Sequence, residues 1–357
     1  MAEIISSRPM SNLRIQTGQA ENPLVTPPDT APTAGASPIP IIHDGDHGSD
    51  DFLASLVALG RKDALNLLGI TTCHGNVSVV KATRNACAAV DIAGPDSVPV
   101  VQGAASPWKM SPRSGDDAFG SDGLGGVALP EPVTKPFGEP AHVWLIKILR
   151  RTPRPVTICI TGPMTNIARL LEEAPNLRAK IARIVAMGGC LGPLGPSRRG
   201  GNITALAEFN FYMDPDAAAY TLQSGIPMVL LPMDVTHQLA FSDRRKSDAL
   251  HHWPEPLGGK LVQMLSAAEA LDREKFGMGG AAIHDPQVMA YLLAPQLYHG
   301  RMASLTVNTD NSSTEHGRLL EDKGAKTQVL LIEHLVSPNE VFEVILDAVR
   351  RVLLSRS

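Results

Sequence analysis

Four aspartates lie within eight consecutive residues of the chain, directly after an apolar run. The stretch reads HDGDHGSDD and contains Asp44, Asp46, Asp50 and Asp51. Carboxylates this close together repel one another strongly in a medium of low dielectric constant, unless a cation neutralises them. Because hard divalent ions prefer oxygen ligands, the spacing predicts a site for Ca²⁺ or Mg²⁺.

The same aspartates are compatible with simpler roles. Asp50 and Asp51 could cap a helix that begins after the apolar run, although capping needs only one or two carboxylates. The D-G-D sequence also fits a phosphatase of the haloacid dehalogenase type, in which one aspartate is the nucleophile and the other an acid. An EF-hand fits poorly, because Ser49 and Ser55 occupy the loop positions that need Gly and Glu.

Apolar runs alternate with helix-like amphipathic segments from residue 39 onward. This alternation is typical of βαβ units, in which a buried parallel sheet is covered by helices. It predicts one α/β domain with a Rossmann-like, mostly parallel sheet and helices on both faces. The apolar runs lie at 39–43, 65–72, 98–101, 155–162, 180–189 and 226–235.

Residues 1–38 differ in composition from the rest of the chain. They are rich in Pro, Thr and Ala and have little periodic apolar content, so they cannot bury enough surface to offset the entropy of ordering. We predict a disordered tail followed by a catalytic domain over 39–357. Two Gly- and Pro-rich stretches, 102–141 and 191–202, are either surface insertions or walls of a ligand site at the ends of the strands.

The overall composition fits a globular enzyme. Hydrophobic residues make up 43% of the chain, charged residues 19%, and the net charge is −4. The sequence has no block of basic residues for nucleic acid and no apolar run long enough to span a membrane. The four cysteines are widely spaced and are expected to be buried thiols in a reducing compartment. These features predict a soluble cytoplasmic protein whose partners are small molecules or proteins.

Polar residues recur at the ends of four further apolar runs. These stretches are GITTCHGN ending at Asn76, ICITGPMTNIA with Thr161 and Asn166, GNITALAEFNFYMDPDAA from Asn202, and AAIHDP with His284 and Asp285. Together with the acidic stretch, they resemble the inosine-uridine preferring nucleoside hydrolase family, in the same order, over most of residues 39–300. The resemblance implies the nucleoside hydrolase fold and hydrolysis of the N-glycosidic bond of ribonucleosides to free base and ribose.

The resemblance also implies roles for individual residues. In the family signature D-x-D-P-G-x-D-D, the second and last aspartates bind Ca²⁺, which implies Asp46 and Asp51 here. The main-chain carbonyl of Thr161 and the carboxylate of Asp285 would complete the protein ligands. Asp46 would be the general base on a metal-bound water, and His284 the general acid toward the leaving base. The residues assigned to the ribose are Asp50, Asn76, Met187, Asn202, Glu208 and Asn210.

Several of these residues also have structural interpretations. His284 could be a buried structural histidine, Asn166 could cap the helix that follows it, and Met187 could fill the core. Polar and aromatic residues alternate over 208–211, so the polar side chains would lie on one face of a strand, where they could be solvated.

The chain departs from the family at three positions. His47 stands where a Pro is usual, Phe119 where relatives often have His, and Phe276 near a usual Tyr. The last two change the expected base pocket, so the sequence does not predict which base is preferred. A non-catalytic protein that binds nucleoside or ribose on the same fold is the second hypothesis. Relatives are commonly homodimers or homotetramers, so we expect a homo-oligomer.

Overall fold

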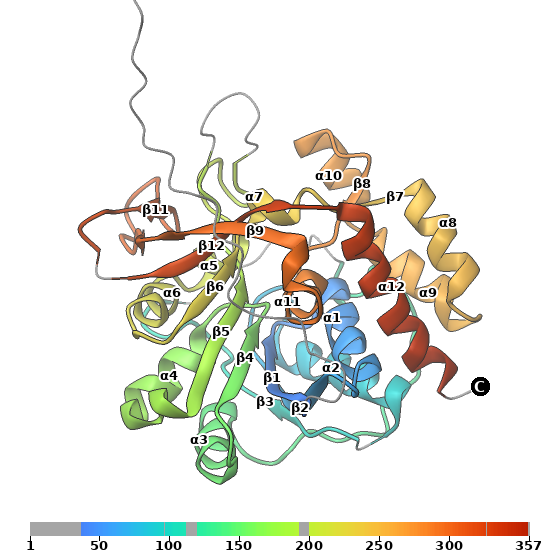
Figure 1. Ribbon diagram of the computed structural model, residues 1–357, viewed down its shortest axis with the longest axis horizontal. Helices are drawn as coiled ribbons and strands as arrows, with labels where there is room; N and C mark the ends of the chain where they lie inside the picture. Colours follow the sequence, from blue (N-terminus) through green and yellow to red (C-terminus); the bar gives the residue numbers. More distant parts are fainter. Residues whose placement is uncertain (1–36, 96, 112–119, 193–199, 326, 356–357) are drawn as a thin grey trace, which may run out of the picture.

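An eight-stranded sheet runs through the centre of the protein (Figure 1). The computed structural model describes residues 37–95, 97–111, 120–192, 200–325 and 327–355. The predictions for residues 1–36 and for Phe119 therefore concern residues outside this description. The strands of the sheet are β1 (Ile39–Gly45), β2 (Leu65–Thr72), β3 (Val100–Gln102), β4 (Val156–Ile160), β5 (Ile181–Met187), β6 (Met228–Leu231), β9 (Tyr298–Ala303) and β12 (Val329–Leu335).

The order of the strands is β3-β2-β1-β4-β5-β6-β12-β9. Neighbouring strands are parallel except β12 and β9, which are antiparallel. The prediction of a mostly parallel α/β sheet is thus confirmed. Two small antiparallel ribbons accompany the sheet, one of β7 (Ala240–Ser242) with β8 (Gly280–Ala282) and one of β10 (Leu305–Val307) with β11 (Leu319–Glu321).

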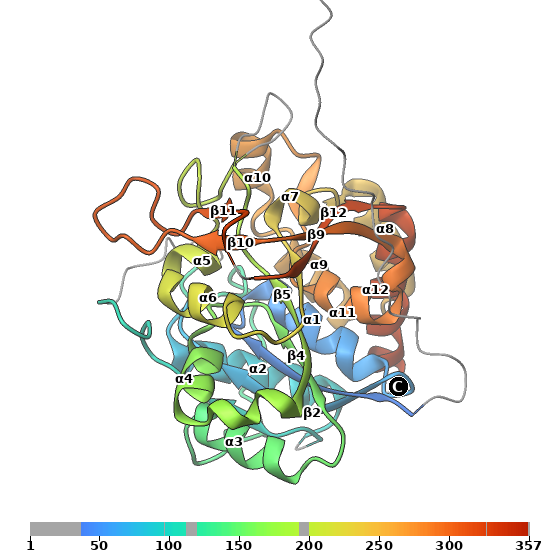
Figure 2. The same cartoon turned by 60° about the vertical axis from the view of Figure 1, so that its left-hand side comes forward.

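Helices cover both faces of the sheet, as the two views show (Figures 1 and 2). They are α1 (Ser49–Gly60), α2 (Val79–Ala93), α3 (Ala141–Arg151), α4 (Thr165–Glu173), α5 (Phe209–Met213), α6 (Pro215–Leu222), α7 (Met233–Thr236), α8 (Asp243–His252), α9 (Leu257–Leu265), α10 (Glu269–Phe276), α11 (Pro286–Leu293) and α12 (Pro338–Leu354), with short 3₁₀ turns at Pro175–Lys180 and Pro295–Leu297. Successive residues of a strand point to opposite faces, so Ile41 packs in the core beneath α1, α2, α11 and α12, whereas Ile42 packs beneath α3, α4 and α6.

The last strand and the last helix that the structure describes complete the sheet and one of its helix layers. Strand β12 lies between β6 and β9 inside the sheet, and α12 packs against α1. The approach of these two helices is close: a Cβ on Gly60 would lie 1.9 Å from the carbonyl oxygen of Ala348. Only glycine fits there.

Helix α1 begins with one half of a capping box, because its N-cap residue is a glycine and has no side chain to complete the motif. The amide of Gly48, the N-cap residue, donates to Oδ2 of Asp51 at 3.0 Å, which satisfies a main-chain N–H that lacks a partner within the helix. The capping role considered for Asp51 is therefore real, and it places this carboxylate at the carboxyl end of β1.

Two interpretations from the sequence are wrong. Residues 208–211 do not form a strand: Glu208 is the N-cap of α5 and accepts from the amides of Asn210 and Phe211, so capping outweighs a short alternation of polar and apolar residues. Asn166 does not cap α4, whose N-cap is Met164.

Asn166 instead ties strand ends together. Its Nδ2 donates to Oδ1 of Asp44 at 2.8 Å and to the carbonyl of Thr72 at 2.9 Å. Its Oδ1 accepts from the amide of Ala104 at 2.9 Å. The side chain is fully buried, so it joins the ends of β1 and β2 to the segment after β3.

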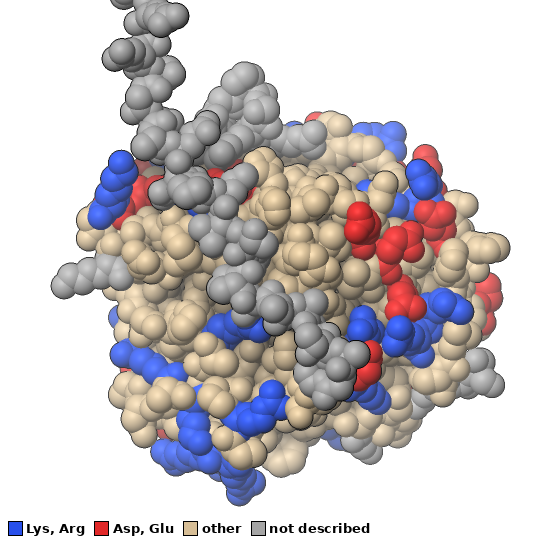
Figure 3. All heavy atoms as spheres, viewed as in Figure 1, with Lys and Arg blue, Asp and Glu red and all other residues tan. Residues whose placement is uncertain are grey.

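The acidic stretch contributes little to the surface. Asp44, Asp46, Asp50 and Asp51 are all buried, whereas Figure 3 shows side chains of both signs spread over the viewed face. All four cysteines are buried and free, as predicted. In the part of the chain that the structure describes, no helix combines the length and the hydropathy of a membrane span.

Replacing Asn166 with Ala is expected to lower the free energy of unfolding by about 2–4 kcal/mol, because it leaves buried polar groups without partners. Urea denaturation measures this difference. Asn66→Ala, at an exposed position of β2, is the matched control and should change the free energy by less than about 0.5 kcal/mol. Equal effects of the two substitutions would contradict the role given to Asn166.

Candidate functional site

A cavity of about 340 Å³ opens at the carboxyl ends of the central strands. Ligands of open parallel sheets bind at this edge, and the volume suits a small molecule. The structure brings together most of the residues that the sequence singled out. Those that line the cavity are Asp50, Asn76, Thr161, Met187, Asn202, Glu208, Asn210, His284 and Asp285.

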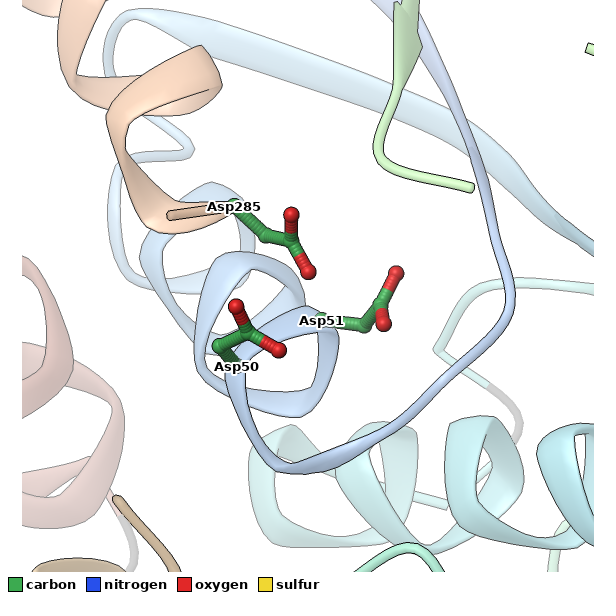
Figure 4. A group of neighbouring side chains, drawn as sticks. All are labelled: Asp50, Asp51 and Asp285. Carbon is green, nitrogen blue, oxygen red and sulfur yellow. The ribbon is translucent and has the colours of Figure 1, made fainter. Parts of the chain in front are cut away.

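Three carboxylates form a cluster beside this cavity (Figure 4). Asp50 and Asp51 lie in the first turn of α1, and Asp285 is the N-cap residue of α11. One oxygen of each lies within 4.8 Å of the others, and all three side chains are buried. The positive ends of the two helix dipoles favour negative charge at these positions.

Asp46 lies next to the cluster and is fully buried. Its Oδ2 accepts from the amide of Asn76 at 2.5 Å, whereas its Oδ1 has no hydrogen-bond partner among the described residues. Asp46 does not line the cavity. A buried carboxylate oxygen without a donor indicates a partner other than the protein.

Burial and the charges of neighbouring carboxylates raise the pKa values of Asp46, Asp51 and Asp285. The pKa of Asp51 rises to about 7, through burial first and the charge of Asp50 second. Burial and the charge of Asp51 raise the pKa of Asp46, and burial and the charge of Asp50 raise that of Asp285. The cluster therefore resists full ionisation unless positive charge compensates it. An all-oxygen donor set of this kind fits a hard divalent cation.

Thr161 connects the cluster with the other wall of the cavity. Its hydroxyl donates to Oδ1 of Asp51 at 2.6 Å, and its carbonyl accepts from Nδ2 of Asn210 at 3.2 Å. The same amide nitrogen lies 3.4 Å from the carbonyl of Met187. Thr161 thus offers two oxygens, each held by a different part of the site.

Glu208 is held rigidly. Its Oε2 accepts from the amides of Gly189 at 2.7 Å and Phe211 at 3.2 Å, and its Oε1 accepts from that of Asn210 at 2.9 Å. Nearby, Oδ1 of Asn202 accepts from the amide of Phe209 at 2.8 Å. These bonds fix both acceptors before any ligand arrives.

His284 lines the cavity and contacts helix α7. Its Nδ1 is 2.7 Å from the hydroxyl of Thr236, and its ring centroid is 5.3 Å from that of His237. His237 in turn makes an edge-to-face contact with Phe276, with centroids 4.6 Å apart. His284 is therefore partly exposed to the cavity, and the interpretation as a purely structural buried histidine does not fit.

Sequence reasoning missed several residues of the cavity. His237 lines the cavity, and its neighbour Thr236 contacts His284. Both are polar residues that follow the apolar run of β6, and polar residues after an apolar run were the pattern that singled out the other stretches. Asp272 and Lys275 belong to α10, where charged residues are ordinary on a solvated face. Yet Asp272 is buried, lines the cavity and accepts from the amide of Ala282 at 2.8 Å. Lys275 donates to the carbonyl of Asn202.

Asp44, the nucleophile of the phosphatase alternative, lies apart from the cavity. It is fully buried, and its Oδ1 accepts from the hydroxyl of Thr71 and from Asn166. A nucleophile must reach its substrate, so this geometry disfavours the phosphatase.

Comparison with known proteins identifies relatives along most of the chain. The sequence model described as inosine-uridine preferring nucleoside hydrolase matches residues 41–342. The uncharacterized protein C1683.06c of Schizosaccharomyces pombe is 35% identical over 87% of this chain and 99% of its own length. The pyrimidine-specific ribonucleoside hydrolase RihA of Citrobacter koseri is 39% identical over 73% of this chain and 81% of its own. Among solved structures, the purine-preferring ribonucleoside hydrolase from Gardnerella vaginalis matches with a TM-score of 0.78 and 27% identity, over 88% of this chain and 99% of that one.

The metal-free protein is expected to lose stability as pH rises from about 4 to about 7. The folded state holds a proton on Asp51 up to a pKa of about 7, against an ordinary value of 3.8, so it binds more protons than the unfolded chain in this window. Urea denaturation across this range, in the presence of a chelator, measures the loss.

The Asp51→Asn variant should show a shallower decline, because it removes one of the coupled carboxylates. Asp243→Asn, at an exposed position of α8, should keep the wild-type slope. A decline as steep in Asp51→Asn as in the wild type would show that this carboxyl group is not responsible.

Proposed function

The chain belongs to the inosine-uridine preferring nucleoside hydrolase family and hydrolyses the N-glycosidic bond of ribonucleosides; we propose that Asp46 is the general base and His284 the general acid, with Ca²⁺ as cofactor. The observation that carries this proposal is the convergence of nine predicted residues on one cavity, with the buried carboxylates beside it. The family resemblance extends the proposal to a homodimer or homotetramer that acts in nucleoside salvage in the cytoplasm.

The cation would be held by Asp46, Asp51, Asp285 and the carbonyl of Thr161. The free Oδ1 of Asp46 and the raised pKa values of the cluster support this assignment. When bound, Ca²⁺ supplies positive charge that orients a water molecule and lowers its pKa.

Asp46 would take the proton of the attacking water. The amide of Asn76 holds its Oδ2, which fixes the orientation of the carboxylate that would accept the proton. A fixed base needs no reorientation at the moment of reaction, which is one source of rate enhancement.

The ribose would be bound by Asp50, Asn76, Asn202, Glu208 and Asn210, with Met187 against the sugar. Cleavage of a glycosidic bond passes through an oxocarbenium-like transition state, in which firm positioning of the sugar hydroxyls supplies several kcal/mol. The three amides on Glu208 support its role as a preorganised acceptor.

His284 would protonate the leaving base. The acid is the imidazolium form, in which Nδ1–H donates to the hydroxyl of Thr236 while that hydroxyl donates to the carbonyl of Met233. The second ring proton is then on Nε2, and its transfer to the base leaves a neutral imidazole. A neutral base leaves more easily than an anionic one, so this transfer lowers the barrier.

Ribose release from inosine, uridine, adenosine, guanosine and cytidine tests the base and the cation together. A chelator should abolish release and added Ca²⁺ should restore it, and Asp46→Asn should lower kcat by at least about 10²-fold. Asp243→Asn should behave as the wild type. Chelator-resistant release would contradict the cation, and full activity of Asp46→Asn would contradict the base. Nucleoside binding without release by the folded wild type would favour a binding protein.

The choice of leaving group separates a role of His284 as general acid from a role in binding the sugar or in folding. His284→Ala should slow hydrolysis of natural ribonucleosides by about 10²- to 10⁴-fold, but should leave p-nitrophenyl riboside within a few-fold of the wild-type rate, because nitrophenolate departs without a proton. His252→Ala, on the exposed side of α8, is the control. Equal losses on both kinds of substrate would indicate that His284 acts on the sugar or the fold instead.

A further inference from the structure

Three polar side chains that the proposed mechanism does not use lie behind the carboxylate cluster. They are His43 of β1, His47 of the following turn and Ser55 of α1, and none of them lines the cavity. Each is fully buried. Polar groups in a core are costly unless they are hydrogen-bonded, so their arrangement calls for a physical reason.

The three side chains form one continuous chain of hydrogen bonds with Thr161 and Asp51, here called the buried relay. The hydroxyl of Thr161 is 2.6 Å from Oδ1 of Asp51 and 2.7 Å from Nε2 of His43. Nδ1 of His43 is 3.0 Å from Oγ of Ser55, which is 3.1 Å from Nε2 of His47. Every link has the length of an ordinary hydrogen bond.

The ionised carboxylate fixes the direction of every bond in the buried relay. A carboxylate only accepts, so Thr161 must donate to Asp51 and must accept from Nε2–H of His43. A neutral imidazole then accepts at Nδ1, so Ser55 donates to it. Ser55 accepts in turn from Nε2–H of His47. Each hydrogen bond of the buried relay therefore has one possible donor, and the relay holds Thr161 and Asp51 in fixed orientations.

Two glycines of the neighbouring backbone, Gly45 and Gly48, lie close against the carboxylate of Asp51. A Cβ on Gly45 would lie 2.3 Å from Oδ1 of Asp51 and 2.4 Å from the hydroxyl of Thr161. The hydrogen bond between these two groups therefore occupies the space above Gly45. On the other side of the carboxylate, the amide of Gly48 holds Oδ2 of Asp51, so both oxygens of Asp51 have fixed donors.

We propose that His43, Ser55 and His47 are positioning residues for the cation site: through the hydroxyl of Thr161 they hold the carboxylate of Asp51 in the orientation that binds Ca²⁺. This inference rests on the proposed function, because it requires the cation. Thr161 has two roles in this proposal: its hydroxyl orients Asp51, and its main-chain carbonyl is a proposed ligand of Ca²⁺. Outer partners of metal ligands typically contribute about 10- to 100-fold to metal affinity.

Calorimetric titration of Ca²⁺ onto the purified, metal-free full chain tests the inference without using turnover. His43→Leu removes both hydrogen bonds of the ring and should weaken Ca²⁺ binding by about 10- to 100-fold. His43→Gln has a similar size and keeps an N–H for Thr161, so its affinity should return to within a few-fold of the wild type. Thr161→Val keeps the carbonyl and the shape but lacks the hydroxyl, and it should lose as much affinity as His43→Leu.

A matched control separates positioning from general stability. Ile42→Val lies on the same strand with its side chain in the opposite core, and it should lower the melting temperature of the metal-free protein without changing Ca²⁺ affinity. Wild-type affinity in His43→Leu and Thr161→Val would overturn the inference, as would an equal loss in Ile42→Val. If His43→Leu does not fold, the Ca²⁺ affinity of Thr161→Val tests the inference instead. Failure of the wild type to bind Ca²⁺ would remove the cation from the proposed function as well, whereas wild-type binding with unaffected variants would overturn the positioning role alone.

Discussion

Repulsion among buried carboxylates is the constraint on which the rest of this structure depends. Asp46, Asp51 and Asp285 are withdrawn from water at one end of the sheet, where burial and the charges of neighbouring aspartates, including Asp50, raise all three pKa values. The fold offers partial compensation through the N-termini of α1 and α11 and through amide and hydroxyl donors. The remaining deficit of positive charge favours a cation at this site, and the residues proposed to bind the ribose lie along the adjacent cavity.

Several groups serve local folding and the site at the same time. Asp51 accepts from the N-cap amide of α1, Glu208 caps α5, and Asp285 is the N-cap residue of α11. A helix N-terminus needs an oxygen acceptor, and sugar hydroxyls or cations need the same kind of oxygen. The parallel sheet brings these helix starts to one edge, so structural caps become the walls of a cavity.

The sequence alone predicted the mostly parallel sheet, because long apolar runs separated by amphipathic segments are typical of buried parallel strands. The family resemblance singled out most of the residues that the structure places along one cavity, Asn76, Thr161 and Asn210 among them. Short-range patterns were less reliable: the alternation over 208–211 spans too few residues to separate a strand from a capped helix.

The contacts that polar side chains make inside the core could not be predicted. His43 and Thr161 are 118 positions apart, and nothing in an apolar strand indicates that one polar side chain in it will meet another. Asp272 was missed for a related reason, since only tertiary packing turns a charged residue of α10 into part of a buried wall. Residue types therefore show which chemistry is available, whereas packing decides which side chains meet.

The place of β12 in the sheet has a consequence for biosynthesis. This strand, close to the end of the described chain, lies between β6 and β9, and α12 after it covers α1. A growing chain on the ribosome therefore holds α1 and β6 before the helix and strand that cover them have been made. Until then the edge of β6 and one side of α1 stay uncovered, and such surfaces are prone to wrong association. The central sheet and the helix layer over α1 are thus complete only after β12 and α12 have been made.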